Sequence, residues 1–365
     1  ALTLVFVYTR RLLDLQTALL AVFFSALSPF FVAHTHLMHL DGLAGSLMVL
    51  SLLAFLSYVN RQHMLDLLLS GIAAGFAWLT KTPAFALGPV LVIVTLLLLW
   101  INREDGNRGW TTVRSPLLSL LTWAVIGLCT FVLFWPAMWV DPLVTLNYIF
   151  SEALGYAGGG HGDPVFFNGT IYSDGRIPAR VITFYPLTYL WRSTPIVLFG
   201  LVLTVPALWQ RWSPLDRRIA RDSIFALLLY ALLFTLFMTL GGKKFDRYLI
   251  PIYPALHLVS AAGWAGLVRW IRSRWLDERP KKPLYVARLL GALIACQFRA
   301  LQSVFPYPMS YYNPLLGGSR RAPLVMQIGW GEGLDAAGRY LNAKPGSDRL
   351  TVASWYRSAL AYYFD

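Results

Sequence analysis

The sequence has 365 residues, of which 57% are hydrophobic and only 13% are charged. A soluble domain carries about a quarter charged residues because its surface must be solvated, so much of this surface faces something other than water. Two cysteines, Cys129 and Cys296, exclude a disulfide framework and a zinc-binding spacing. We therefore predict an all-α polytopic membrane protein. In a soluble protein the net charge of +13 would favour a nucleic-acid partner.

Apolar segments recur along the first 305 residues. A bilayer core about 30 Å thick requires roughly 20 apolar residues per helix. After an incomplete first helix, we predict nine spans near residues 15–33, 41–59, 67–80, 83–101, 116–139, 187–209, 223–241, 250–271 and 284–304. The 67–80 segment is short and ends at Lys81-Thr82-Pro83, which predicts a tilted or broken helix and a tight turn.

The cations between these spans alternate strictly between the two sides. One side carries sixteen: Arg10, Arg11, Arg61, Arg103, Arg108, Arg114, Arg211, Arg217, Arg218, Arg221, Arg269, Arg272, Arg274, Arg279, Lys281 and Lys282. The short connections on the other side carry Lys81, Lys243, Lys244 and Arg247. Because cytoplasmic loops are enriched in lysine and arginine, we predict that the Arg-rich side is cytoplasmic. The basic excess then follows membrane topology and requires no nucleic acid.

Two segments outside the spans fall on the opposite side. Residues 140–186 form a long, glycine-punctuated loop without an obvious element of its own, and such loops are usually functional or disordered. Residues 306–365 begin with turns, then predict a helix near 332–343 and a strand over 349–356. We interpret them as the start of an extracytoplasmic α/β domain. Gly329-Trp330-Gly331-Glu332-Gly333 resembles a nucleotide loop only weakly, because no strand precedes it, and is read as the start of a helix.

Ionisable groups near apolar spans are costly and tend to mark function. On the extracytoplasmic side they are Asp41, Lys81, the segment Lys243–Arg247, and the residues of the long loop. The loop residues are Asp141, Glu152, His161, Asp163, Asp174, Arg176 and Arg180. Cations beside a carboxylate at a membrane surface suit a lipid-borne phosphate and a polar acceptor, since lysine contacts phosphate as a point charge and arginine can clamp two oxygens.

Each candidate also has a plainer interpretation. Asp41 is equally suited to capping the span 41–59, and Lys81 to extending its ammonium to the interface. The Lys243–Arg247 segment can be an ordinary loop, although it opposes the charge trend. His161 can be a solvent-exposed loop residue or a titratable group and ligand.

Three histidines, His34, His36 and His39, precede Asp41 and suggest a metal site. In a continuous helix His34 and Asp41 share a face, whereas His36 and His39 point elsewhere. We therefore favour interfacial polar residues over a metal site.

Several motifs occur in a characteristic order: Ser28-Pro29-Phe30, Leu40-Asp41, the segment from Gly71 to Pro83, and Arg247-Tyr-Leu-Ile-Pro251-Ile-Tyr-Pro254. This order resembles the bacterial dolichyl-phosphate-mannose protein mannosyltransferase-like family. These are C-type glycosyltransferases related to the enzyme that attaches aminoarabinose to lipid A. The resemblance covers roughly residues 1–305. The segments 161–167, 307–314 and 329–333 are similar to a subgroup of large bacterial members with an extracytoplasmic C-terminal domain.

The resemblance implies transfer of a sugar from a polyprenyl-phosphate carrier to a glycan, lipid or protein acceptor outside the cytoplasm, usually with inversion. The enzyme would lie in the bacterial inner membrane, surrounded by membrane lipid. By position, Lys81 is similar to the lysine that contacts the carrier phosphate. Asp41 is similar to the acidic residue at the start of the helix beside the active-site cavity, and His161 to the loop histidine that assists a divalent metal or the phosphate.

Lys243, Lys244 and Arg247 stand where cations of the family stabilise the departing polyprenyl phosphate, on which negative charge develops. The family's catalytic aspartate, the general base, lies in the loop between the first two membrane helices. This chain begins at what is similar to the second helix, so we expect a fragment that lacks this loop and is inactive by itself.

Two other functions are consistent with a polytopic chain. A transporter or lipid flippase predicts internal repeats and ionisable residues in mid-span, whereas the charges here gather at one interface. A non-catalytic membrane subunit would obtain the missing loop from a partner.

Overall fold

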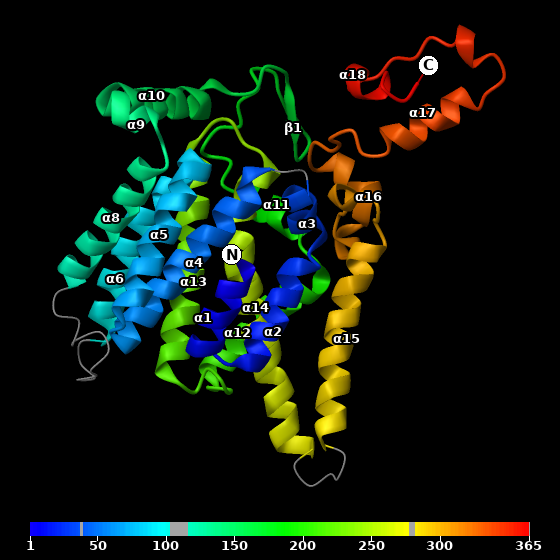
Figure 1. Ribbon diagram of the computed structural model, residues 1–365. Coiled ribbons are helices and arrows are strands. Elements are labelled where there is room, and N and C mark those ends of the chain that lie inside the picture. Colours follow the sequence, from blue (N-terminus) through cyan, green and yellow to red (C-terminus); the bar gives the residue numbers. More distant parts are fainter. Residues whose placement is uncertain (37–38, 103–115, 277–281, 365) are drawn as a thin grey trace.

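The computed structural model describes residues 1–36, 39–102, 116–276 and 282–364 of this chain. Long helices packed side by side form its body (Figure 1). These helices are α1 (Leu2–Leu12), α2 (Leu15–Ala26), α3 (Pro29–His36), α4 (Leu40–Arg61), α5 (Met64–Thr80), α6 (Leu87–Asn102), α8 (Pro116–Leu133), α11 (Phe184–Arg192), α12 (Pro195–Trp209), α13 (Arg218–Leu240), α14 (Tyr253–Ile271) and α15 (Lys282–Gln302). Short turns of helix precede α6 and flank α14: η1 (Thr82–Ala86), η2 (Asp246–Ile252) and η3 (Arg272–Leu276).

The predicted membrane architecture is confirmed. Within the described residues, 6 helices are long and apolar enough to cross a membrane, or up to 8 if each of two bent pairs is one span. The six are Leu40–Arg61, Thr82–Ile101, Pro116–Leu133, Arg218–Leu240, Asp246–Trp275 and Leu284–Gln302. Helix α5, over the predicted 67–80 segment, is shorter than these spans.

Two predicted straight spans are bent. The 15–33 segment forms α2 and α3, which meet at 62°, and the 187–209 segment belongs to α11 and α12, which meet at 117°. In each pair the second helix begins at a proline, Pro29 or Pro195. Proline cannot donate a backbone hydrogen bond to the preceding turn, but it fits the first position of a new helix.

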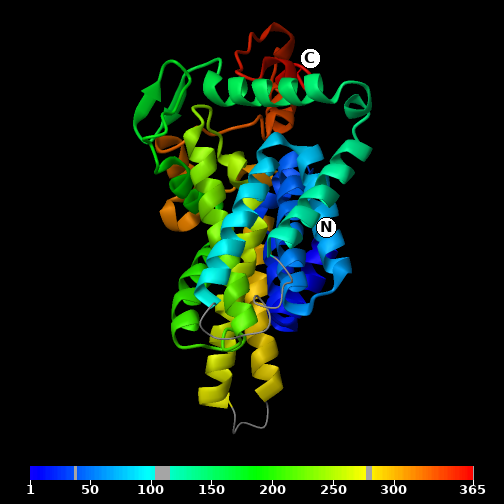
Figure 2. The ribbon, with the colours of Figure 1, turned by 90° about the vertical axis from the view of Figure 1, so that its left-hand side faces the viewer.

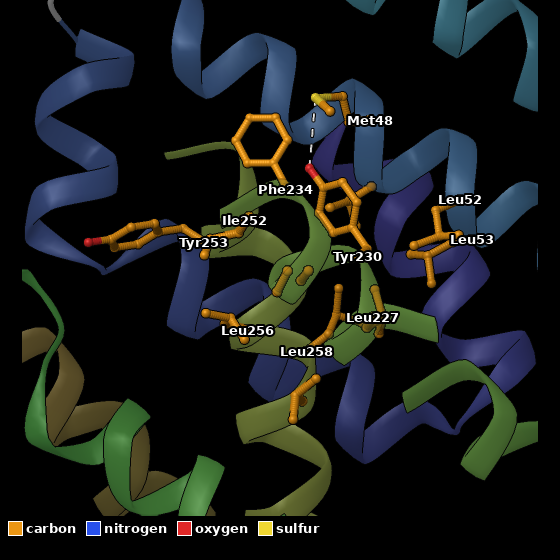
Figure 3. Packing of buried hydrophobic residues seen from close by; sticks show 14 of the residues in the cluster. Met48, Leu52, Leu53, Leu227, Tyr230, Phe234, Ile252, Tyr253, Leu256 and Leu258 are labelled. Atoms are coloured by element: carbon orange, nitrogen blue, oxygen red, sulfur yellow. Dashed lines mark hydrogen bonds between the residues drawn. The ribbon is translucent and has the colours of Figure 1, made fainter. Parts of the chain in front are cut away.

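The core lies between α4, α13 and α14. Figure 3 shows their apolar side chains facing one another: Met48, Leu52, Leu53, Leu227, Tyr230, Phe234, Leu256 and Leu258. Tyr230 satisfies its buried hydroxyl by donating to the carbonyl of Pro251 at 3.0 Å. A second tight contact joins α12 to α14, where Gly200 and Gly263 let the two backbones approach without room for a Cβ.

Above one end of the bundle lies α10 (Pro142–Gly159), which runs across the long helices in both views (Figures 1 and 2). It follows α9 (Ala137–Val140) and precedes the antiparallel hairpin of β1 (Val165–Phe167) and β2 (Thr170–Tyr172). The prediction that residues 140–186 lack elements of their own is therefore wrong. Asp141 starts α10 by accepting a hydrogen bond from the Val144 amide at 3.2 Å, and Pro142 occupies the first turn.

The C-terminal segment projects from the same end (Figure 1). It contains η4 (Pro308–Ser310), η5 (Pro314–Leu316), α16 (Gly318–Arg321), η6 (Ala322–Leu324), α17 (Leu334–Asn342), η7 (Ser347–Arg349) and α18 (Arg357–Leu360). The predicted helix near 332–343 is confirmed as α17. The predicted strand over 349–356 is wrong, because no strand among the described residues lies beside it to pair with its backbone.

The charged groups separate to the two ends of the bundle. At one end Arg11 lies 3.4 Å from Asp66, and Arg269 lies 2.6 Å from Asp14. The candidate site lies at the other end, below α10. Six of the predicted cytoplasmic cations have side chains outside the described residues: Arg103, Arg108, Arg114, Arg279, Lys281 and Lys282.

Candidate functional site

Asp41 and Lys81 form an ion pair at the head of α4. Lys81 lies in the extended residue between α5 and η1, and its ammonium donates to Asp41 Oδ1 at 2.5 Å. The Asp41 side chain is almost fully buried, whereas that of Lys81 is 26% exposed. Asp41 is the second residue of α4, and the N-cap is His39, so the interpretation of Asp41 as the helix cap is wrong. The Lys81 side chain points inward, with its ammonium 5.0 Å from the centre of the Tyr248 ring.

Two of the three histidines join this pair. His39 Nδ1 lies 2.8 Å from Asp41 Oδ2, without the alignment of a good hydrogen bond. The rings of His34 and His39 have centroids 5.8 Å apart. The prediction that these histidines point away from each other is wrong, because α3 ends at His36 and α4 begins anew at Leu40. Burial lowers the pKa of His39 despite the nearby carboxylate. Within the described part of the chain, no three His, Cys, Asp or Glu side chains gather as metal ligands.

Arg247 lies beside this cluster, with its guanidinium against three aromatic rings. Its guanidinium carbon is 4.4 Å from the centre of the Trp330 ring, 4.5 Å from Phe245 and 5.7 Å from Tyr248. Cation–π contacts of this kind hold a guanidinium without neutralising it. Among the described residues no carboxylate forms an ion pair with Arg247, and its Nε is buried without a hydrogen-bond partner. Arg247 therefore has no ion-pair partner among the described residues.

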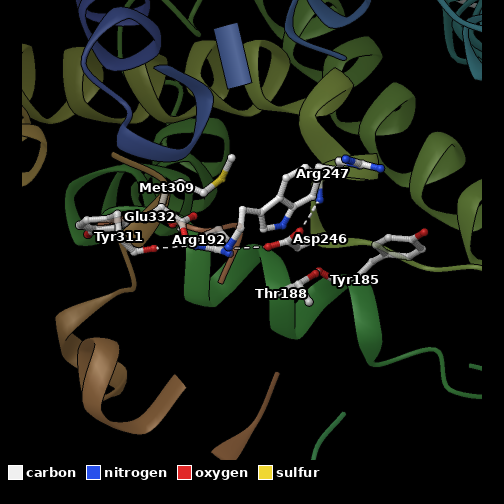
Figure 4. A network of polar contacts seen from close by, with 9 residues as sticks. Tyr185, Thr188, Arg192, Asp246, Arg247, Met309, Tyr311 and Glu332 are labelled. Atoms are coloured by element: carbon white, nitrogen blue, oxygen red, sulfur yellow. Dashed lines mark hydrogen bonds and ion pairs between the residues drawn. The ribbon is translucent and has the colours of Figure 1, made fainter. Parts of the chain in front are cut away.

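The carboxylate next to it is already paired. Asp246 accepts from Arg192 Nε at 2.8 Å, and the same arginine donates to the carbonyls of Met309 at 2.7 Å and Tyr311 at 3.1 Å (Figure 4). Arg192 is 1% exposed, and it ties α11, η2 and the C-terminal segment together. Arg192 is not among the predicted site residues, although it falls inside the predicted span 187–209, where an arginine is itself a signal.

The remaining predicted cations do not converge on one point. Lys244 is buried and donates to the carbonyls of Thr239 at 2.5 Å and of Gly241, at the end of α13. Its charge complements the negative end of the helix dipole, and burial lowers its pKa to about 8. Lys243 instead lies over the ring of Tyr156 from α10, 3.6 Å from its centre.

His161 belongs to the rim of the cluster. Its Nε2 donates to the backbone carbonyl of Lys244 at 3.0 Å, and its ring meets that of Phe245 edge-on at 4.3 Å. Burial lowers the pKa of His161, and the charges of Lys243 and Arg247 act in the same direction. Its ring is thus next to Phe245, which in turn contacts Arg247.

Trp330 is a second site residue that is not among the predicted ones. Its ring lies 6.0 Å from that of His34, 6.4 Å from His39 and 6.3 Å from Phe245, in addition to its contact with Arg247. The interpretation of Gly329–Gly333 as the start of a helix is confirmed, since α17 begins at Leu334 with Gly333 as its N-cap. The segment also carries an aromatic side chain into the candidate site.

Two cavities bear on what can bind. One of about 10 Å³, room for roughly one water molecule, touches Asp41, Lys81 and Tyr248. Another, of about 690 Å³, is apolar and lies between α12, α14 and α15, with Thr194 and Tyr311 in its wall. It contains none of the charged residues predicted from the sequence.

Comparison with known proteins supports the predicted relationship. No curated protein matches the chain. One family model matches part of it, over residues 1–135, and this part includes Asp41 and Lys81 but not His161 or Arg247. The matching family is described as dolichyl-phosphate-mannose-protein mannosyltransferase, which agrees with the resemblance predicted from the sequence over residues 1–135.

Proposed function

We propose that this chain is a membrane glycosyltransferase that moves a sugar from a polyprenyl-phosphate carrier to an acceptor. The reaction would take place on the extracytoplasmic side of a bacterial inner membrane. The family match supports the reaction class. The observation that carries the proposal is the guanidinium of Arg247, which has no ion-pair partner among the described residues and lies next to the Asp41–Lys81 pair, at the end of the bundle opposite the predicted cytoplasmic arginines.

The charge balance of this cluster favours an anion. Asp41 is neutralised by Lys81, and Asp246 by Arg192. Arg247 then remains as a positive charge with a buried donor that lacks a partner. Because a buried donor without a partner is costly, a ligand that accepts hydrogen bonds there would be stabilised. A phosphate group fits, since arginine can bind two of its oxygens at once.

The same residues suit the departure of a phosphate. When the bond between the sugar and the carrier breaks, negative charge develops on the phosphate, and cations already in place stabilise it. Arg247 would bind this group directly. The Lys81 ammonium has three donors, of which Asp41 occupies one, so Lys81 can add a second contact. In this proposal Asp41 holds Lys81 in position, and Lys244 stabilises the end of α13 rather than the ligand.

The geometry gives less support to transport. A transporter site is expected near the middle of the membrane, between broken helices. Here the broken pairs α2–α3 and α11–α12 do occur, but the candidate cations lie at one end of the bundle. Uptake of a lipid-linked sugar into vesicles without its transfer would nevertheless favour the transporter over the proposed enzyme.

Binding of a short polyprenyl phosphate to the full-length protein in nanodiscs tests the phosphate site. Loss of a charge-assisted hydrogen bond costs about 1.5–3 kcal/mol, so we expect Arg247→Ala to weaken binding roughly 10- to 100-fold. The affinity of Arg247→Lys should fall between those of Arg247→Ala and the unmodified protein, because lysine keeps the charge but not the paired donors. The control is Arg349→Ala, since the Arg349 side chain is 89% exposed. Equal affinity of Arg247→Ala and the unmodified protein would contradict the assignment.

A further inference from the structure

His34 is a buried polar residue without a partner. It is 1% exposed, and neither Nδ1 nor Nε2 has a hydrogen-bond partner. Most buried polar groups in proteins are paired, so a side chain that leaves both nitrogens unpaired requires an explanation. One ring nitrogen of a neutral histidine donates and the other accepts. His34 therefore offers a donor and an acceptor that the described protein atoms do not use.

The ring that covers His34 comes from a distant part of the sequence. Trp330 meets His34 edge-on, with an angle of 89° between the ring planes. Its neighbours Gly329 and Gly331 have φ angles of 90° and 88°, a backbone region that glycine adopts readily and other residues rarely do. The backbone on either side of Trp330 is therefore not restricted by a side chain of Gly329 or Gly331. Trp330 is also 37% exposed, so part of the indole remains open to a ligand.

We infer that Trp330 and His34 form a binding subsite for the sugar ring of a glycosylated polyprenyl phosphate. This inference rests on the proposed function. A hexopyranose has hydroxyl groups that both donate and accept hydrogen bonds, which suits the two nitrogens of His34. The C–H groups on one face of its ring are apolar and pack on an aromatic surface such as the indole of Trp330.

The position of Trp330 relative to Arg247 agrees with the chemistry of such a donor. In a glycosyl phosphate the sugar carbon is bonded directly to a phosphate oxygen, so the two binding sites must be adjacent. The Arg247 guanidinium lies 4.4 Å from the Trp330 ring, and the His34 ring lies on the edge of the same indole. A sugar would reach His34 by displacing the edge of the indole that is in contact with it, and its phosphate would then lie next to Arg247.

Other ligands fit these residues less well. A metal ion needs several converging ligands, and the described side chains offer no group of three. A second anion would be bound by cations, whereas His34 is surrounded by aromatic rings, those of Phe30 at 4.7 Å and His39 at 5.8 Å. A neutral polyhydroxylated ring matches this combination of aromatic surface and unpaired nitrogens.

The test compares two probes, a short polyprenyl phosphate and a panel of its hexosyl derivatives, mannosyl and glucosyl among them. Binding is measured by calorimetry with the full-length protein in nanodiscs. We expect at least one hexosyl derivative to bind more tightly than the bare phosphate. Trp330→Ala should weaken binding of that derivative roughly tenfold more than binding of the bare phosphate, because only the derivative loses its sugar contact, whereas both probes lose one of the rings that hold Arg247. Trp330→Phe should retain part of the preference for the hexosyl derivative over the bare phosphate. The matched control is Trp355→Ala, because Trp355 is 76% exposed in the same C-terminal segment.

The possible outcomes separate the two proposals. If Trp330→Ala weakens both probes by the same factor, or neither, Trp330 merely holds the C-terminal segment and the sugar subsite is refuted. If no hexosyl derivative binds more tightly than the bare phosphate, the subsite is refuted as well, although the phosphate site stands. If the unmodified protein binds neither probe, the proposed function is refuted, and the sugar subsite with it. His34→Gln provides a second variant and should reduce the preference for the sugar in the same way.

Discussion

Arg192 offers a direct test of how the C-terminal segment is attached to the membrane helices. Its guanidinium donates to Asp246, Met309 and Tyr311 at 2.7–3.1 Å, and it also lies over the ring of Tyr312, 4.1 Å from its centre. Arg192→Met keeps much of the side-chain length but leaves the Asp246 carboxylate buried without its partner. Breaking a buried ion pair in this way costs about 3–5 kcal/mol.

The expected loss corresponds to a change of roughly 150- to 4,000-fold in the unfolding equilibrium. Denaturant titration of the protein in detergent micelles measures it. Adding Asp246→Asn to Arg192→Met should restore part of the stability, because the unpaired charge is then gone. Arg339→Met is the matched control, since the Arg339–Asp335 pair is on the surface and exposed pairs contribute little. An Arg192→Met protein as stable as the unmodified one would refute this account of the attachment.

Two further predictions concern packing and pH. Gly263→Ala should lower the free energy of unfolding by about 1–3 kcal/mol, because the added Cβ would collide with the carbonyl of Gly200. Thermal unfolding measures this loss. Gly291→Ala is the control, because a Cβ added at Gly291 lies in open space. His161 has a pKa below its usual 6.5 because of burial, so the folded protein binds fewer protons there than the unfolded chain. Its contribution to stability is complete above pH 6.5 and decreases as the pH falls below that value. His161→Gln should therefore reduce the loss of stability between pH 7 and pH 5, and an unchanged pH profile would contradict the burial-induced shift.

The sequence was sufficient to predict the membrane helices and much of the charged cluster. Long apolar segments identify spans directly, and Asp41, Lys81 and Arg247 are conspicuous because ionisable residues are rare next to such segments. The bends in two spans were less predictable, although Pro29 and Pro195 mark where they occur. Helix α10 was missed despite a signal in the sequence, since an aspartate followed by a proline is a common start for a helix.

The remaining parts of the site depend on contacts between distant segments. His34 and Trp330 are almost 300 residues apart in the sequence, and no local pattern indicates that their rings meet. Lys244 has the same charge as Arg247, yet only the position of the end of α13 shows that it binds backbone carbonyls instead. The strand predicted over 349–356 failed for a related reason. A suitable side-chain pattern forms a strand only where a neighbouring strand can pair with its backbone.

Release of polyprenyl phosphate from a glycosylated carrier tests the central claim most directly. The measurement uses the full-length protein in membranes that contain acceptor, with the donor labelled in its lipid. We predict release by the unmodified protein together with transfer of the sugar, and a loss of roughly 100-fold or more in Lys81→Ala, provided that this variant remains folded in detergent. Near-normal release by a folded Lys81→Ala protein, or movement of the intact donor across the membrane without release, would contradict the account.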